Sequence, residues 1–112
     1  MGQNGITLVY VCNGLLFIIL GIPLVLNKIG PNSFYGFRTA KSLSDPKTWY
    51  AVNHIGGIDV CIAGVSIILG SLLFRIILRS YTPSTMTLAN AGMLICALAC
   101  VVIHFIIVMK RY

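Results

Sequence analysis

Three long runs of apolar residues constrain this chain more than any other feature of its sequence. They cover about residues 6–26, 55–78 and 86–109, and a helix needs roughly 20 such residues to cross a bilayer. Charged residues make up only 9% of the chain, against roughly 25% in soluble domains. The sequence therefore predicts an all-α membrane protein, a single transmembrane domain over residues 1–112 with three transmembrane helices.

The distribution of positive charge predicts how the chain is oriented. With three spans, the first loop and the C-terminal tail lie on one side of the membrane, and the N-terminus and second loop lie on the other. The second loop region carries only Arg75 and Arg79. The other side carries six cations: Lys28, Arg38, Lys41, Lys47, Lys110 and Arg111. The positive-inside rule then predicts a multi-pass protein of the cell membrane with its N-terminus outside and its first loop and C-terminus in the cytoplasm.

The first loop, residues 27–50, is expected to lie along the membrane interface. Phe34, Tyr35 and Phe37 surround a glycine within it, and aromatic side chains favour headgroup depth. Ser44 or Asp45 followed by Pro46 is a typical helix start. A helix running from there to residue 78 is longer than the bilayer core. It should therefore protrude from the membrane or bend at its Gly-Gly pair, residues 56–57.

Polar side chains in and near the second span suggest one ion pair. Asp59 is the one acid near a span, and an ionised carboxylate there needs a partner, a proton or water. Arg38 is the expected partner, because its planar guanidinium suits a carboxylate. Such a pair could tether the loop to the second helix or serve a function, and both readings stay open. His54 is one turn earlier and could titrate or simply hydrogen-bond.

Other clusters of reactive residues give only weak indications of a metal site or a catalytic site. Cys96, Cys100 and His104 share one helical face, which suits a metal or, equally, close helix packing. We expect no metal and no cofactor. His54 and Asp59 are five residues apart, roughly 140° around a helix, so they do not form an acid–base pair. The chain shows no phosphate loop and no nucleic-acid module. We therefore expect that it is not an enzyme and that it has no nucleic-acid partner.

Small residues on the outer faces of the spans suggest a surface for self-association. Ser66 with Gly70, or Gly92 with Cys96, could support a homodimer. One further face of the second helix should meet another helix. Four residues recur on it at every fourth position, with the first as an interfacial anchor: Trp49, Asn53, Gly57 and Cys61.

The loop and the start of the second helix contain an ordered motif. Its pattern is close to P-N-x-x-x-G-x-R-T, a spacer with Ser, then W-x-x-x-N. The matching residues are Asn32, Gly36, Arg38, Thr39, Ser42, Trp49 and Asn53. Over roughly residues 14–75 the chain resembles the SdpI/YfhL family of small membrane proteins.

This resemblance implies bacterial immunity to, or sensing of, a secreted toxic peptide that acts on membranes. It places a binding site at Asn32, Gly36, Arg38, Thr39, Trp49 and Asn53, with membrane lipids and a toxic peptide as partners. The alternative is a lipid-handling or small transport protein that holds an anionic headgroup at Arg38, with Asp59 carrying a proton. From the residues alone, the motif could also serve mainly to attach the loop to the second helix.

Overall fold

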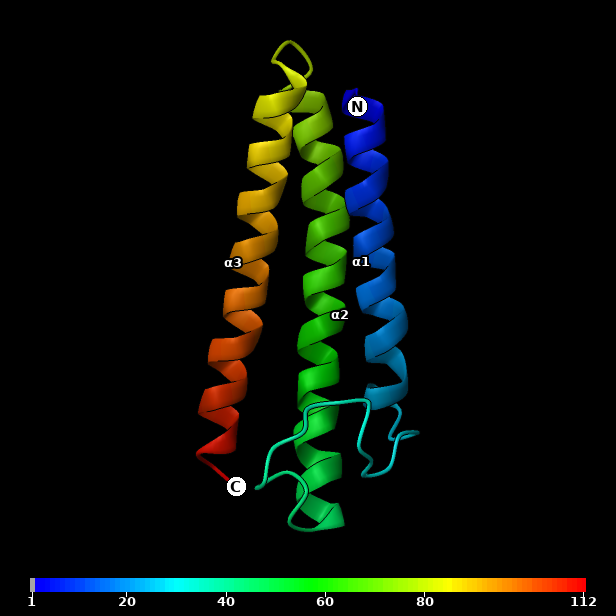
Figure 1. Cartoon of the computed structure of the whole chain (residues 1–112), viewed down its shortest axis with the longest axis vertical. Helices are drawn as coiled ribbons and strands as arrows, with labels where there is room; N and C mark the ends of the chain where they lie inside the picture. The colour runs from blue at the N-terminus through cyan, green and yellow to red at the C-terminus, as the bar shows by residue number, and fades with distance from the viewer. Residues whose placement is uncertain (1) are drawn as a thin grey trace.

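The computed structural model describes residues 2–112 and consists of three long helices within those residues. They are α1 (Gln3–Val25), α2 (Pro46–Ile77) and α3 (Pro83–Met109). Each helix is long and apolar enough to cross a membrane. The helices run along the long axis of a molecule 52 Å in length, with α2 between α1 and α3 (Figure 1). This confirms the all-α fold with three spans.

Helix α2 begins where its sequence signal predicts. Asp45 is the residue before it, Pro46 is in its first turn, and the Asp45 carboxylate accepts hydrogen bonds from the backbone N–H and the hydroxyl of Thr48 at 2.9 and 2.8 Å. These bonds, the backbone bond above all, lower the pKa of Asp45. The expected first loop therefore ends at Asp45, and residues 46–50 are helical.

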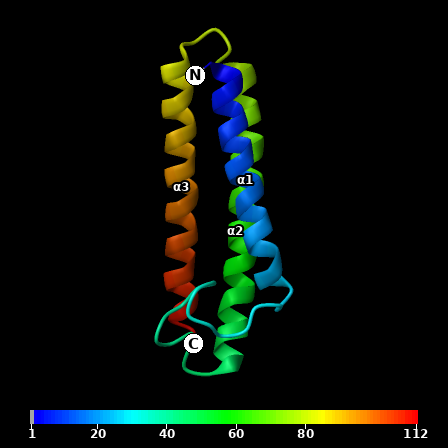
Figure 2. The same ribbon diagram turned by 45° about the vertical axis from the view of Figure 1, so that its right-hand side comes forward.

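The length of α2 gives the loop a surface to pack against. It has 32 residues and continues as one α-helix through Gly56 and Gly57, which at 1.5 Å per residue is about 48 Å. A bilayer core is about 30 Å thick. The N-terminal turns of α2 extend beyond the end of α1, and the loop wraps around them (Figures 1 and 2). We call residues 26–45 the motif loop.

Helices α1 and α2 touch along a seam of four glycines. A Cβ on Gly64 would lie 2.6 Å from the carbonyl oxygen of Gly14, and a Cβ on Gly21 would lie 2.8 Å from that of Gly57. The backbones are therefore in direct contact, which maximises van der Waals attraction where the hydrophobic effect gives little help. In each helix the two glycines are seven residues apart, so they lie on one face.

The same seven-residue spacing extends the seam toward the other end of the molecule. It reaches Thr7 on α1 and Ser71 on α2, both of which are buried. The sequence contains this pattern, although the small-residue pairs expected to support association lie on other faces. Of those, Gly70 packs against Met93 of α3 within the chain, while Gly92 has open space beside it.

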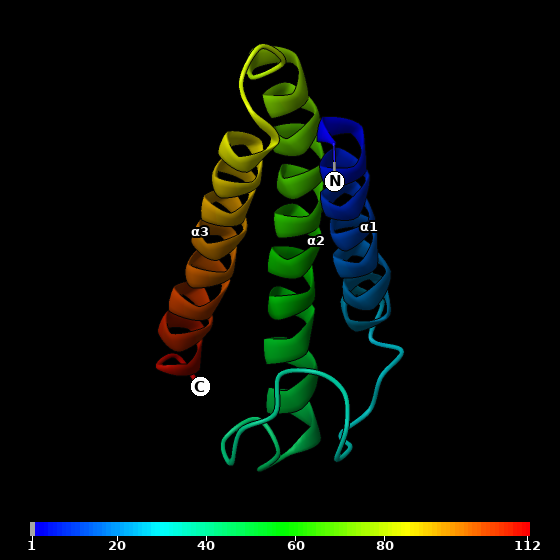
Figure 3. The ribbon, with the colours of Figure 1, turned by 45° about the horizontal axis from the view of Figure 1, so that its top comes forward.

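Helix α3 packs less closely and diverges from α2 toward its C-terminal end (Figures 1 and 3). The motif loop lies near this widening space. Phe37 packs against Gly56 of α2 and stacks on Phe105 of α3, with ring centroids 5.0 Å apart. Lys41 Nζ donates to the carbonyl oxygen of Met109, 2.5 Å away, and a cation is favourable at a helix C-terminus. The loop thus joins the ends of α2 and α3.

The glycine seam makes a direct prediction about stability. Gly64→Ala should destabilise the protein by about 1–3 kcal/mol, because the new methyl group would overlap the backbone of Gly14. Gly92→Ala is the matched control: nothing lies within 4 Å of its Cβ position, and Ala favours a helix over Gly. Unfolding in mixed micelles would measure both. Equal stability of the two variants would contradict the seam.

Candidate functional site

Asn32 organises the first turn of the motif loop. Its Oδ1 accepts hydrogen bonds from the backbone N–H groups of Phe34 and Tyr35 at 2.8 and 2.7 Å. Its Nδ2 donates to the carbonyl oxygens of Gly30 and Tyr35 at 2.8 and 3.0 Å. An amide offers two donors and two acceptor positions, and all four are in use. The Asn32 side chain therefore shapes the loop and has no hydrogen-bonding capacity left for a ligand.

Gly36 is required at its position for two independent reasons. Its φ angle is +109°, a conformation that residues with a side chain rarely adopt. A Cβ there would also lie 2.7 Å from Oδ1 of Asn53 and 3.1 Å from the ring of Trp49. The loop backbone thus passes directly over α2 at this glycine.

Trp49 and Asn53 hold the loop to α2 from one helix face. Both are buried. Asn53 Oδ1 accepts from the backbone N–H of Phe37 at 2.6 Å, and its Nδ2 donates to the Trp49 carbonyl at 3.0 Å. Trp49 Nε1 donates to the carbonyl oxygen of Ile29 at 2.8 Å. Trp49 is thus a buried clamp on the loop, not the interfacial anchor that the sequence suggested.

The rest of the helix face that includes Trp49 and Asn53 meets α1, as expected. Gly57 lies on the glycine seam, and the Cys61 thiol is 3.8 Å from the carbonyl oxygen of Ile18. One face of α2 therefore binds the loop with its first half and α1 with its second.

Thr39 and Ser42 close the far end of the loop. The backbone N–H of Thr39 donates to Ser42 Oγ at 2.8 Å, and the backbone N–H of Ser42 donates to Thr39 Oγ1 at 3.0 Å. Ser42 is fully buried, and its hydroxyl donates to the Phe37 carbonyl at 2.9 Å. The Thr39 hydroxyl therefore accepts a bond within the loop.

Arg38 is the motif residue whose charged group remains exposed. Its Nε–H donates to the carbonyl oxygen of Asn32 at 3.0 Å, so the guanidinium is oriented by the same residue that shapes the first turn. Within residues 2–112, no acceptor is bonded to its two terminal amino groups. Those two groups form the planar fork that binds carboxylates and phosphates.

The expected pairing of Arg38 with Asp59 is wrong. Asp59 Oδ2 lies 2.5 Å from Nδ1 of His104 on α3, with the Asp59 side chain 18% exposed and that of His104 46% exposed. Sequence reasoning assigned His104 only to the cysteine stripe, because the relative depth of α2 and α3 was unknown. The sequence did contain a signal for this pair. His104 lies about one turn from the C-terminal end of the third span, and Asp59 lies about one turn from the N-terminal end of the second span.

His54 has a structural partner. Its Nδ1 lies 2.7 Å from the carbonyl oxygen of Val25. A carbonyl can only accept, so Nδ1 carries the proton of this bond. Val25 ends α1, where carbonyl groups lack partners within the helix, and His54 supplies one. The two residues of the expected ion pair or proton site, Asp59 and His54, are thus directed to different helices.

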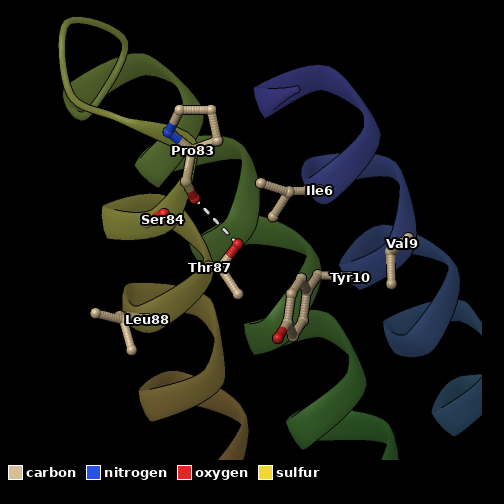
Figure 4. Close-up of a pocket in the computed structure, with 7 residues that line it drawn as sticks. All are labelled: Ile6, Val9, Tyr10, Pro83, Ser84, Thr87 and Leu88. Carbon is tan, nitrogen blue, oxygen red and sulfur yellow. Dashed lines mark hydrogen bonds between the residues drawn. The ribbon is translucent and has the colours of Figure 1, made fainter. Parts of the chain in front are cut away.

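Two apolar pockets lie between α1 and α3. The larger, about 600 Å³, is at the end away from the motif loop, and Figure 4 shows its lining from Ile6, Val9 and Tyr10 of α1 to Leu88 of α3. Its Thr87 hydroxyl bonds to the Pro83 carbonyl at 3.0 Å. The smaller, about 340 Å³, reaches the motif loop. Only the smaller pocket adjoins residues of the motif, so size alone does not identify the site.

The backbone of Gly36 can be tested by substitution. Gly36→Ala should release the motif loop from α2, because the new methyl group would be strained in φ and would overlap Asn53. Trypsin should then cut faster after Arg38 and Lys41. Gly30→Ala is the control, since its Cβ would meet only the Tyr50 hydroxyl at 3.3 Å. Equal cleavage of the two variants would show that Gly36 does not hold the loop.

A double-mutant cycle tests the partner of Asp59. Asp59→Ala and His104→Ala should each lower the free energy of unfolding. Because residues in contact are coupled, the double variant should lose about 0.5–3 kcal/mol less than the sum of the two single losses. Asp59→Ala with Arg38→Ala should be additive within about 0.5 kcal/mol. Unfolding in micelles gives both values. Coupling to Arg38 in place of His104 would restore the pairing expected from the sequence.

Comparison with known proteins identifies the family. A family model described as the SdpI/YfhL protein family matches residues 28–110, about three quarters of the chain. No curated protein and no solved structure matches the chain. The match begins later than the resemblance over residues 14–75 and extends beyond it to include α3. On this evidence, the chain belongs to the SdpI/YfhL protein family.

Proposed function

We propose that this protein is a binding protein of the bacterial cell membrane that confers immunity to, or senses, a membrane-active toxic peptide. The observation that carries the proposal is the arrangement of the family motif. Asn32, Thr39, Trp49 and Asn53 bond within the protein and make the loop rigid, while Arg38 is held with its fork exposed. Such an arrangement suits recognition, and the proposal includes no enzymatic activity.

The chemistry of the exposed groups favours an anionic or amphipathic partner. A preorganised guanidinium loses little conformational entropy on binding, so it can hold a peptide carboxylate more firmly than a flexible lysine can. Phe34, a residue that is 94% exposed in the same loop, offers an apolar contact beside this charge. A membrane-active peptide has both an apolar face and polar or charged groups, and it meets both kinds of contact at this interface.

The proposal places the motif loop in the cytoplasm, where the excess of cations predicts it. Cysteine labelling in intact cells tests this orientation. Lys47→Cys should react with a membrane-impermeant maleimide only after the cells are opened, and Ser80→Cys in the second loop should react before. The background is a variant without native cysteines, all four of which are in the helices. Labelling of Lys47→Cys in intact cells would reverse the orientation.

Protection itself is measured by survival. Bacteria that express the protein and are challenged with secreted peptides encoded beside its gene should survive better than cells with an empty vector. Arg38→Ala should return survival to the vector level, whereas Arg79→Ala, at the other end of the molecule, should not. Both variants must first be shown to reach the membrane in equal amounts. Protection that is unchanged in Arg38→Ala would refute the role of this loop.

A further inference from the structure

The smaller pocket is suited to hydrocarbon. Its side walls are apolar residues of all three helices, and the backbone and side chains of residues 35–37 in the motif loop close it at one end. The helix residues are Phe17, Leu20, Leu24, Val60, Leu98 and Val101. Tyr35 is the one polar side chain in the lining, and its hydroxyl bonds to the carbonyl oxygen of Leu20.

Water is a poor occupant of such a pocket. A bound water needs two to four polar partners, and the lining offers almost none. The pocket lies between α1 and α3, two helices that span the membrane, so lipid can enter it from the side. Its volume of about 340 Å³ falls within the range of sites that hold small ligands.

The loop that closes this pocket also carries an exposed cation, Arg38. Arg38 follows Phe37 directly, and Phe37 lines the pocket. The chain has only two acids. Asp45 binds Thr48 at the start of α2, and Asp59 binds His104. Within residues 2–112 neither acidic side chain is bonded to Arg38, so its free amino groups can accept an anion from outside the chain.

We propose that the pocket and Arg38 together form one site for an anionic phospholipid. An acyl chain fills the pocket between α1 and α3, and the headgroup phosphate accepts hydrogen bonds from the terminal amino groups of Arg38. In this site the Nε–H bond to Asn32 orients the guanidinium of Arg38. The two terminal amino groups stay available to donate to the phosphate. The net positive charge at this end of the molecule favours an anionic lipid over a zwitterionic one.

This site goes beyond the proposed immunity and does not depend on it. A lipid and a peptide carboxylate would compete for the same fork. The lipid experiment uses purified protein with no peptide present, so its failure leaves the protection experiment unaffected, and loss of protection leaves the lipid experiment unaffected.

Native mass spectrometry of the full chain in detergent tests the site. The probes are phosphatidylglycerol, phosphatidylcholine and glycerol phosphate, which has the headgroup without the acyl chains. The wild type should retain phosphatidylglycerol at least about tenfold more tightly than either other probe. Phosphatidylcholine has the same phosphate but neutralises it with its own ammonium group, and glycerol phosphate lacks the acyl chains that would fill the pocket. Equal retention of the two lipids would overturn the anionic headgroup site, and equal binding of glycerol phosphate would overturn the acyl-chain pocket.

Three variants separate the two halves of the site. Arg38→Ala should lose the preference for phosphatidylglycerol, and Arg38→Lys should recover part of it, because it keeps the charge without the fork. Leu98→Trp should fill the pocket and weaken retention of both lipids. Lys28→Ala, an exposed cation outside the pocket lining, should retain phosphatidylglycerol as the wild type does.

The variants also show how the proposal could be wrong. Equal losses in Lys28→Ala and Arg38→Ala would indicate diffuse charge attraction and would overturn the role of the fork. Unchanged retention in Leu98→Trp would place the acyl chain elsewhere. Trp49 fluorescence, which reports on the buried clamp of the motif loop, verifies that the Arg38 and Lys28 variants keep their fold. Helical content by circular dichroism does the same for Leu98→Trp, which adds a second tryptophan.

Discussion

The backbone contact between α1 and α2 determines where the other parts of this protein lie. Because Gly14 and Gly21 meet Gly64 and Gly57 without intervening side chains, the two helices form a close pair with a fixed register. That register ends α1 beside the first half of α2 and leaves the first turns of α2 exposed beyond it. The motif loop packs on those turns. Helix α3 then rests on a different face of α2 and leaves pockets between itself and α1.

The motif loop meets a condition that the membrane imposes on any irregular segment. Backbone without regular structure is tolerated near the hydrocarbon only where its polar groups are satisfied by protein or water. Asn32 satisfies four groups of the loop, and Asn53 binds the backbone of Phe37. The motif of the loop therefore describes, in large part, how the loop is attached to α2. Arg38 differs from the other motif residues because its backbone contact leaves most of its donors exposed.

The sequence predicted the fold well and the site only in part, for physical reasons. Apolar length determines spans, and Asp45 with Pro46 determines the start of α2, so both were predictable from local rules. Partners across helices depend on relative depth, which local rules do not contain. Asp59 was therefore assigned to Arg38 when the structure pairs it with His104. The seven-residue glycine spacing was visible in the sequence, but it became meaningful only once α1 and α2 were known to be neighbours.

The scarcity of acids has a consequence for how this protein meets its surroundings. A chain with eight basic residues and two acids cannot neutralise itself, and here both acids already serve internal contacts, one at a helix start and one between α2 and α3. Lys41 is directed to the end of α3, but Arg38 is directed outward. A fixed cation at the membrane interface attracts anions from the bilayer at all times and from a peptide only when one arrives. In the site that we propose, a lipid phosphate is the resting partner that a peptide would have to displace, and the exchange between them would link lipid binding to recognition.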